Sequence, residues 1–115
     1  MNIVNQNGQS IAIIDRTYKI DNTQAVLDLM ADAWYQGQCT GMVLFQDSLN
    51  ERFFDLKTGL AGEILQKFAN YHFKMAIVGD FSIYPSESLK DFIYECNNGR
   101  HIFFKADMIS AMASF

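Results

Sequence analysis

Short apolar runs alternate with amphipathic segments along most of this 115-residue chain. Four runs have the length and composition of buried strands, at residues 11–14, 42–45, 75–78 and 102–104. Elsewhere, apolar residues recur with the spacing of one helix face, over residues 23–37, 60–68, 87–96 and 106–115. Apolar strands that alternate with helices form a central, mostly parallel sheet covered by helices. The pattern therefore predicts an α/β fold.

A hairpin is predicted before the first helix. Ile3 and Val4 precede the apolar run 11–14, and Asn7-Gly8 between them is the strongest two-residue signal for a hairpin turn. The expected order is ββαβαβαβα, with about five strands and four helices, and residues 51–54 are a candidate for an extra turn of helix. No linker or repeat interrupts the chain, so residues 1–115 are predicted to form a single domain.

Composition narrows the class of function. Hydrophobic residues make up 50% of the chain, which is sufficient for a substantial core. The net charge is −4 and the 9 Lys and Arg residues form no run, which argues against nucleic-acid binding. No apolar run approaches the roughly 20 residues of a membrane span, and the N-terminus lacks the pattern of a signal peptide. We therefore expect a cytoplasmic protein with neither membrane nor nucleic acid as a partner.

The two cysteines support the same compartment. Cys39 and Cys96 lie outside any C-x-x-C motif. Two buried free thiols are the expected state, and a disulfide between them is the alternative. Free thiols agree with the reducing conditions of a cytoplasm.

The most informative segment lies where a loop is expected to meet the second long helix. Asp55, Thr58 and Gly59 stand at this junction, and Gly62 follows within the first turn. Backbone N–H groups at a helix start are unpaired and can receive an anion or a partner. A phosphate on Thr58 would place about two negative charges beside Asp55. These four residues are the predicted binding or switch surface.

The two glycines of this surface have competing explanations. Glycine in a helix costs about 1 kcal/mol relative to alanine, so its presence needs a reason. Tight packing of the helix on the sheet is the structural explanation, and it is the simpler one. Close approach by a partner is the functional explanation.

An alternative site is predicted at the carboxyl ends of the strands, where open parallel sheets usually bind ligands. These ends carry Asp15, Asp47, Asp80 and Lys105. Three carboxylates and a lysine can hold Mg²⁺ and a phosphate, which would suit a small enzyme or a ligand-binding domain. Aspartate is also a common strand terminator and helix cap, and this is the favoured interpretation. We expect no metal, no cofactor and no catalytic residue.

Exposed aromatic residues bear on oligomeric state. Trp34 and Tyr35 are predicted to pack between helix and sheet. An exposed aromatic such as Tyr35 or Tyr84 would instead provide the interface of a homodimer, which is a further hypothesis.

Three segments carry a family resemblance. Residues 53–68 (FFDLKTGLAGEILQKF), 76–82 (AIVGDFS) and 88–97 (SLKDFIYECN) resemble an uncharacterised family of short bacterial proteins, classed as a domain of unknown function. The similarity covers essentially the whole chain. It implies a family but no activity.

The chain also shows a more distant similarity to the STAS domain, the type found in anti-sigma-factor antagonists. The element order matches that fold, and Asp55 to Leu60 resemble the aspartate, hydroxyl, glycine and leucine signature at the start of its second helix. The resemblance implies that Thr58 is the residue a partner kinase phosphorylates. The spacing from Asp55 to Thr58 is one residue longer than usual, and Lys57 replaces a small or hydroxyl residue. The expected function is a non-enzymatic STAS-like regulatory or interaction module with an unknown protein partner.

Overall fold

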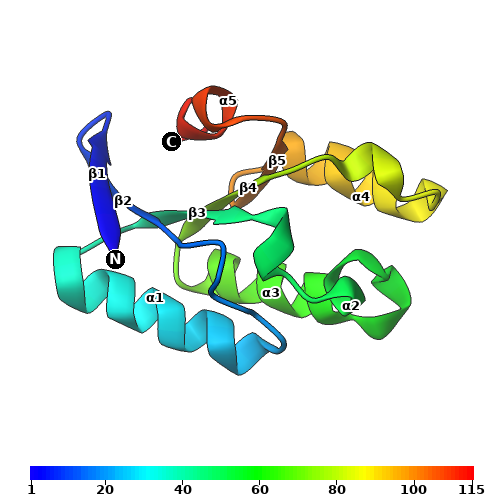
Figure 1. Ribbon diagram of the computed structural model, residues 1–115, viewed down its shortest axis with the longest axis horizontal. Helices are drawn as coiled ribbons and strands as arrows, with labels where there is room; N and C mark the ends of the chain where they lie inside the picture. The colour runs from blue at the N-terminus through cyan, green and yellow to red at the C-terminus, as the bar shows by residue number, and fades with distance from the viewer.

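A five-stranded sheet forms the centre of the computed structural model, which describes residues 1–115 (Figure 1). Its strands follow chain order and are β1 (Asn2–Gln6), β2 (Gln9–Ile13), β3 (Gly41–Phe45), β4 (Lys74–Val78) and β5 (Ile102–Lys105). β1 pairs with β2 as an antiparallel hairpin, and the remaining pairs are parallel. The predicted α/β fold with an N-terminal hairpin and a mostly parallel sheet is confirmed.

Five α-helices accompany the sheet, where four were predicted. They are α1 (Thr23–Gly37), α2 (Glu51–Phe54), α3 (Leu60–Asn70), α4 (Glu87–Asn97) and α5 (Met108–Met112). The additional helix is α2, which the sequence indicated only as a candidate turn. Three 3₁₀ turns, residues 46–48, 56–58 and 81–83, complete the connections.

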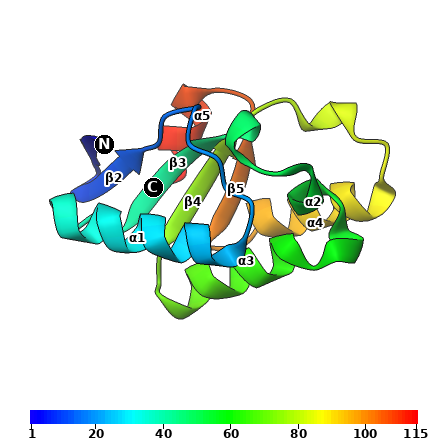
Figure 2. The same cartoon turned by 60° about the horizontal axis from the view of Figure 1, so that its bottom comes forward.

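The two faces of the sheet are covered unequally. Consecutive parallel strands joined by right-handed crossovers place their helices on one face, and α1, α3 and α4 all lie there, with α5 on the other face (Figure 2). The core on the three-helix face contains 24 buried residues and that under α5 only 5. The main core therefore lies between the sheet and α1, α3 and α4.

Side-chain caps set the helix starts. Asn22 accepts a hydrogen bond from the N–H of Ala25 at the start of α1, and Ser86 accepts one from Leu89 at the start of α4. Both caps satisfy N–H groups that have no partner within the helix.

Cys39 and Cys96 are buried free thiols, as expected. None of the helices has the length and apolar character that a membrane span requires.

The placement of two aromatic residues differs from the prediction. Trp34 and Tyr35 do not pack between helix and sheet, because their side chains are 55% and 90% exposed. The side of α1 that faces the core is instead formed by Val26, Leu29, Met30 and Ala33. Periodicity identified this buried side correctly but could not show that a neighbouring aromatic pair faces outward.

Candidate functional site

Two short turns bring the chain to the start of α3. Asn50 caps α2 by accepting a hydrogen bond from the N–H of Arg52 at 2.9 Å. Asp55 then caps the turn 56–58 by accepting one from the N–H of Lys57 at 3.2 Å. Polar side chains thus satisfy the backbone of this segment locally, and Thr58 ends the turn that Gly59 joins to α3.

Thr58 is exposed, but its hydroxyl group is held in place. The hydroxyl donates its single hydrogen to the carbonyl oxygen of Arg52 at 2.6 Å, and the carbonyl oxygen of Asp55 lies 2.9 Å from the same Oγ1. The same oxygen accepts a weaker bond from the N–H of Leu60 at 3.3 Å. The hydroxyl therefore ties the turn to the end of α2 while the residue remains on the surface.

The structure separates the two glycines of the predicted surface. Gly59 has φ of +78°, a left-handed conformation that favours glycine. Gly62 lies in α3 and is exposed. A Cβ atom added at either residue would meet no other atom within 4 Å. Tight packing of α3 on the sheet is therefore wrong as the explanation for these glycines, and Gly62 has no internal reason to lack a side chain.

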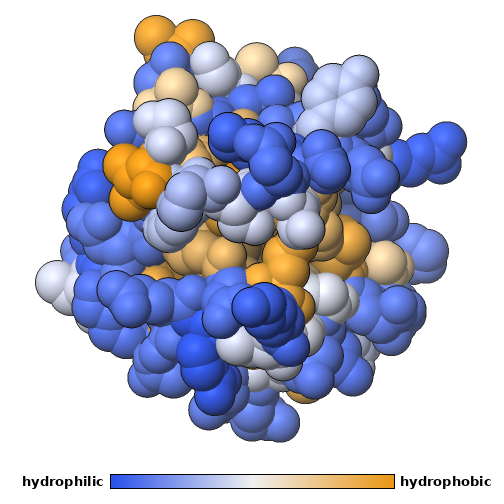
Figure 3. Space-filling view, turned by 90° about the vertical axis from the view of Figure 1, so that its right-hand side faces the viewer, coloured by the Kyte–Doolittle hydropathy of each residue, from blue (hydrophilic) through white to orange (hydrophobic).

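Gly62 borders a depression of about 360 Å³ between α3 and α4. Leu65 and Ala69 of α3 and Phe92 of α4 supply apolar parts of its lining. Figure 3 shows the side of the molecule where α2 and α4 lie in Figure 1, and apolar atoms line a recess in its middle. On the other side of Gly62, Glu63 accepts a hydrogen bond from the hydroxyl of Thr23 on α1.

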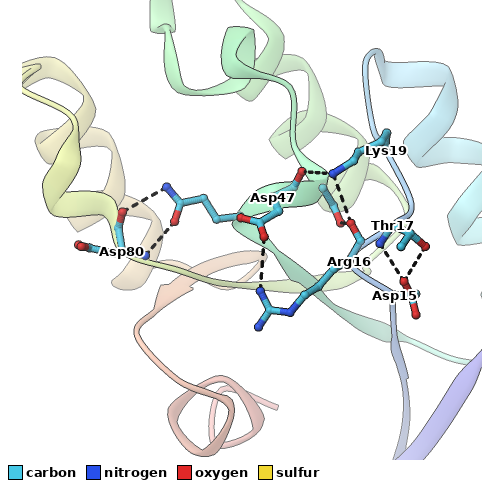
Figure 4. Close-up of polar contacts among 8 residues, drawn as sticks. Asp15, Arg16, Thr17, Lys19, Asp47 and Asp80 are labelled. Carbon is cyan, nitrogen blue, oxygen red and sulfur yellow. Dashed lines mark hydrogen bonds and ion pairs between the residues drawn. The ribbon is translucent and has the colours of Figure 1, made fainter.

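The alternative site at the strand ends is only partly assembled. Asp15 accepts hydrogen bonds from the hydroxyl and the N–H of Thr17, at 2.6 and 2.8 Å. These bonds lower the pKa of the Asp15 carboxyl, the hydroxyl having the larger effect. In Figure 4 this carboxylate turns toward Thr17 and away from Asp47. It is engaged in its own turn.

Asp80 at the end of β4 is engaged in the same way. Its carboxylate accepts hydrogen bonds from the hydroxyl and the N–H of Ser82, at 2.5 and 3.0 Å, and both bonds lower its pKa. Two of the three carboxylates predicted at this edge therefore cap local turns. No group of three or more His, Cys, Asp or Glu side chains is arranged to hold a metal ion.

Asp47 has a different environment. Its carboxylate lies 3.6 Å from the guanidinium of Arg16, and its backbone carbonyl accepts a hydrogen bond from Lys19 at 2.8 Å (Figure 4). Asp47, Asp80 and Lys105 line one depression of about 640 Å³, together with Arg16. Asp15 does not line it. The structure thus brings three of the four predicted residues around one opening.

Residues 5–115 match the sequence family described as Domain of unknown function (DUF4180). The chain belongs to this family. No curated protein and no solved structure matches the chain. Membership of the DUF4180 family therefore brings no assigned residue, and the candidate sites rest on geometry.

Sequence reasoning missed several polar residues of this DUF4180 domain. Gln46 joins the ends of β3 and β4, and Ser48 is the one buried polar residue. Arg16 lies over the ring of Phe45, 4.0 Å from its centre. Nothing in the local pattern marks these residues, because each acts on a segment distant in sequence. The one signal in the sequence was that Gln46 directly follows an apolar strand, which places it at the carboxyl edge of the sheet.

Proposed function

We propose that this DUF4180 domain is a non-enzymatic regulatory or protein-interaction module, and that Asp55, Thr58, Gly59 and Gly62 form its contact surface. The partner is another protein. The observation that carries the proposal is Gly62, an exposed helical glycine with open space on every side of its missing Cβ. Such a residue lowers helix stability by about 0.5–1 kcal/mol relative to alanine. A partner protein that contacts the backbone of α3 closely explains why glycine stands here despite this loss of helix stability.

The neighbouring depression supports a protein as the partner. Leu65 and Ala69 of α3 and Phe92 of α4 line it, together with polar residues that include Gln66, Glu95 and Arg100. A groove with both apolar and polar lining, beside an exposed helical glycine, fits a side chain or helix of another protein. Thr58 lies two residues before α3, close to the end of the helix that carries Gly62.

Thr58 is suited to act as a switch. Its hydroxyl donates a hydrogen bond to a backbone carbonyl, and a phosphate ester oxygen cannot donate one. Phosphorylation would therefore release the turn from the end of α2. It would also add about two negative charges close to Asp55, which repels them. Both effects change the shape and charge of the contact surface.

Element order and cysteine state support the wider assignment. The order of strands and long helices agrees with that expected of a STAS-like domain, and the short hydroxyl-glycine turn precedes the second long helix. Two buried free thiols fit a protein of the reducing cytoplasm. A cytoplasmic, STAS-like module is thus our proposal for its class.

Binding measurements with matched variants test the contact surface. Immobilised wild-type protein is used to isolate a partner from lysate of the source cells, and affinities are then measured with purified components. Thr58→Asp and Gly62→Arg are expected to weaken binding at least tenfold. Gly62→Arg is preferred to a change at Gly59, where positive φ would strain any side chain. Thr40→Asp and Ala113→Arg, both exposed and away from this surface, serve as controls.

The proposal is contradicted if Thr58→Asp and Gly62→Arg bind the partner as tightly as wild type does. Far-ultraviolet circular dichroism of each variant confirms the fold. A specific partner lost only with the controls would place the contact elsewhere.

A second candidate function is ligand binding at the strand-end depression. The observation that favours it is the meeting of Asp47, Asp80 and Lys105 with Arg16 around one opening. A small molecule with both acidic and basic groups fits this mixture of charges. Thermal-shift screening of such compounds tests it, with Lys105→Ala expected to abolish any shift. The absence of any shift, or a shift that survives Lys105→Ala, counts against this site.

A further inference from the structure

A second apolar stripe runs along the exposed side of α1. Its members, spaced by single turns of the helix, are Leu27, Ala31, Trp34 and Tyr35. Trp34 and Tyr35 are exposed by 55% and 90%, whereas the stripe that packs on the core is fully buried. Large apolar side chains that gather on a surface mark a contact region.

A groove adjoins this stripe. It has a volume of about 340 Å³ and only hydrophobic side chains line it, namely Leu27, Met30, Ala31, Trp34, Tyr71 and Phe73. Tyr71, at the end of α3, is 64% exposed. The stripe and the groove together form one continuous apolar surface, which we call the α1 surface.

We propose that the α1 surface pairs with the same surface of a second copy of this chain, with the two α1 helices antiparallel and centred on Ala31. The order of side-chain sizes along the stripe carries this inference. Leu27 lies one turn before Ala31 and Tyr35 one turn after it, so large groups stand at both ends and a small one in the middle. In an antiparallel pair, Leu27 of each copy faces Tyr35 of the other, and the two Ala31 residues meet at the symmetry axis. A surface that fits itself in this way is what a two-fold dimer requires.

The available area is sufficient for a dimer. With side chains of roughly 150–250 Å² each, Trp34, Tyr35 and Tyr71 expose about 400 Å² per copy and about 800 Å² for a pair. Leu27, Ala31 and the surrounding polar rim bring the pair to about 1,000 Å², the lower limit for a specific interface. We therefore expect a dimer with a dissociation constant in the micromolar range.

Mass measurement across a concentration series tests the proposal. Light scattering of the full chain is expected to rise from 13.1 kDa toward twice that mass as concentration increases through the micromolar range. Trp34→Glu and Ala31→Arg are expected to keep the chain monomeric, with unchanged circular dichroism. Tyr94→Glu, on the 71%-exposed aromatic of α4, is the matched control and leaves the dimer intact.

Two further measurements locate the interface. Trp34 is the only tryptophan, so its fluorescence is expected to shift to shorter wavelength as the dimer forms. Ala31→Cys is expected to form a disulfide-linked dimer on oxidation, because the two residues meet at the axis. The native cysteines are buried and give no background, and Asp91→Cys on α4 is the control.

Three outcomes overturn the proposal: a monomer at all concentrations, a dimer that survives both α1 substitutions, or cross-linking as efficient through Asp91→Cys. Capture of a different protein by this surface, without self-association, overturns it as well. Thr58 and Tyr71 flank opposite ends of α3, which spans about 16 Å. Trp34→Glu should therefore leave binding at the Thr58 surface unchanged, and the two proposals can fail separately.

Discussion

The side-chain amide of Gln46 binds both backbone groups of Asp80. Its Oε1 accepts a hydrogen bond from the Asp80 N–H at 2.8 Å, and its Nε2 donates to the Asp80 carbonyl at 3.1 Å. The second amide hydrogen reaches the hydroxyl of Tyr84 at 2.8 Å. One side chain therefore extends the pairing of β3 and β4 beyond the sheet and holds the loop that leads to α4.

Removing this amide is expected to destabilise the protein. Gln46→Ala should lower the free energy of unfolding by about 1–2 kcal/mol, because three hydrogen bonds are lost where water can replace them only in part. Urea denaturation at neutral pH measures the change. Gln66→Ala, which removes a surface bond to Asn70 within α3, is the control and should cost less than about 0.5 kcal/mol. Equal effects of the two substitutions would show that Gln46 has no special role.

Gly79 is expected to tolerate no side chain. A Cβ atom there would collide with Oε1 of Gln46 and lie 2.6 Å from its Cβ. Gly79→Ala should therefore lower stability by about 1–3 kcal/mol. Because the collision needs both residues, the double variant Gln46→Gly/Gly79→Ala should lose less than the two single variants together. Additive losses in urea denaturation would contradict this contact.

The two glycines near Thr58 should respond in opposite directions. Gly62→Ala is expected to raise the free energy of unfolding by about 0.5–1 kcal/mol, since the added methyl group meets nothing and the helix gains. Gly59→Ala should lower it by about 1–2 kcal/mol because φ is positive. Thermal unfolding followed by circular dichroism compares them. A destabilised Gly62→Ala would show that α3 packs more closely than the structure indicates.

Acid should weaken the turn after β4. Hydrogen bonds from Ser82 lower the pKa of Asp80 in the folded state, so the ionised group stabilises the fold above its unfolded pKa of about 3.9. That contribution is lost as pH falls through the folded-state pKa. Asp80→Asn should melt at a lower temperature than wild type at neutral pH, and the gap should narrow as pH falls below the unfolded pKa and through the lower folded-state pKa. A gap that widens in acid would contradict this sign.

The thiols are expected to be unreactive in the native protein. Burial raises the pKa of Cys39, and burial together with the nearby charge of Glu95 raises that of Cys96 to about 11. Because the thiolate is the reactive form, an aromatic disulfide reagent at mildly alkaline pH should label neither residue until denaturant is added. Two thiols per chain should then react. Rapid labelling of the native protein would indicate an opening of the core that exposes one of them.

The predicted elements were confirmed where the signal was local. Short apolar runs, apolar residues at helical spacing and the Asn7-Gly8 turn each act within a few residues, so the hairpin, the strands and the long helices follow from sequence. α2 could not be predicted with the same force, because four residues do not sustain a helix alone. It is held by tertiary contacts: Phe53 and Phe54 are buried, and the ring of Phe54 stacks on Tyr84 at 4.6 Å.

The candidate site shows the same division. Asp55, Thr58 and Gly59 were recognised from their positions before a helix, and the structure places them in capping turns. Whether Gly62 faced the sheet or the solvent depended on the rotation of α3, which the packing of its buried side against the core decides. At the strand ends, Asp15 and Asp80 cap the turns that follow them. Which of the strand-end residues lie close together is decided by contacts between strands, namely the bonds of Gln46 to Asp80 and of Arg16 to Asp47.

The sequence by itself determined the fold class, the hairpin and the starts of the long helices, since backbone preference and apolar periodicity are short-range properties. The tertiary structure alone decided that Gly62 lies open, that three of four strand-end residues share one depression, and that Trp34 and Tyr35 face outward. Each of these depends on the mutual orientation of segments distant along the chain, and that orientation is set by the packing of the whole core rather than by any local pattern.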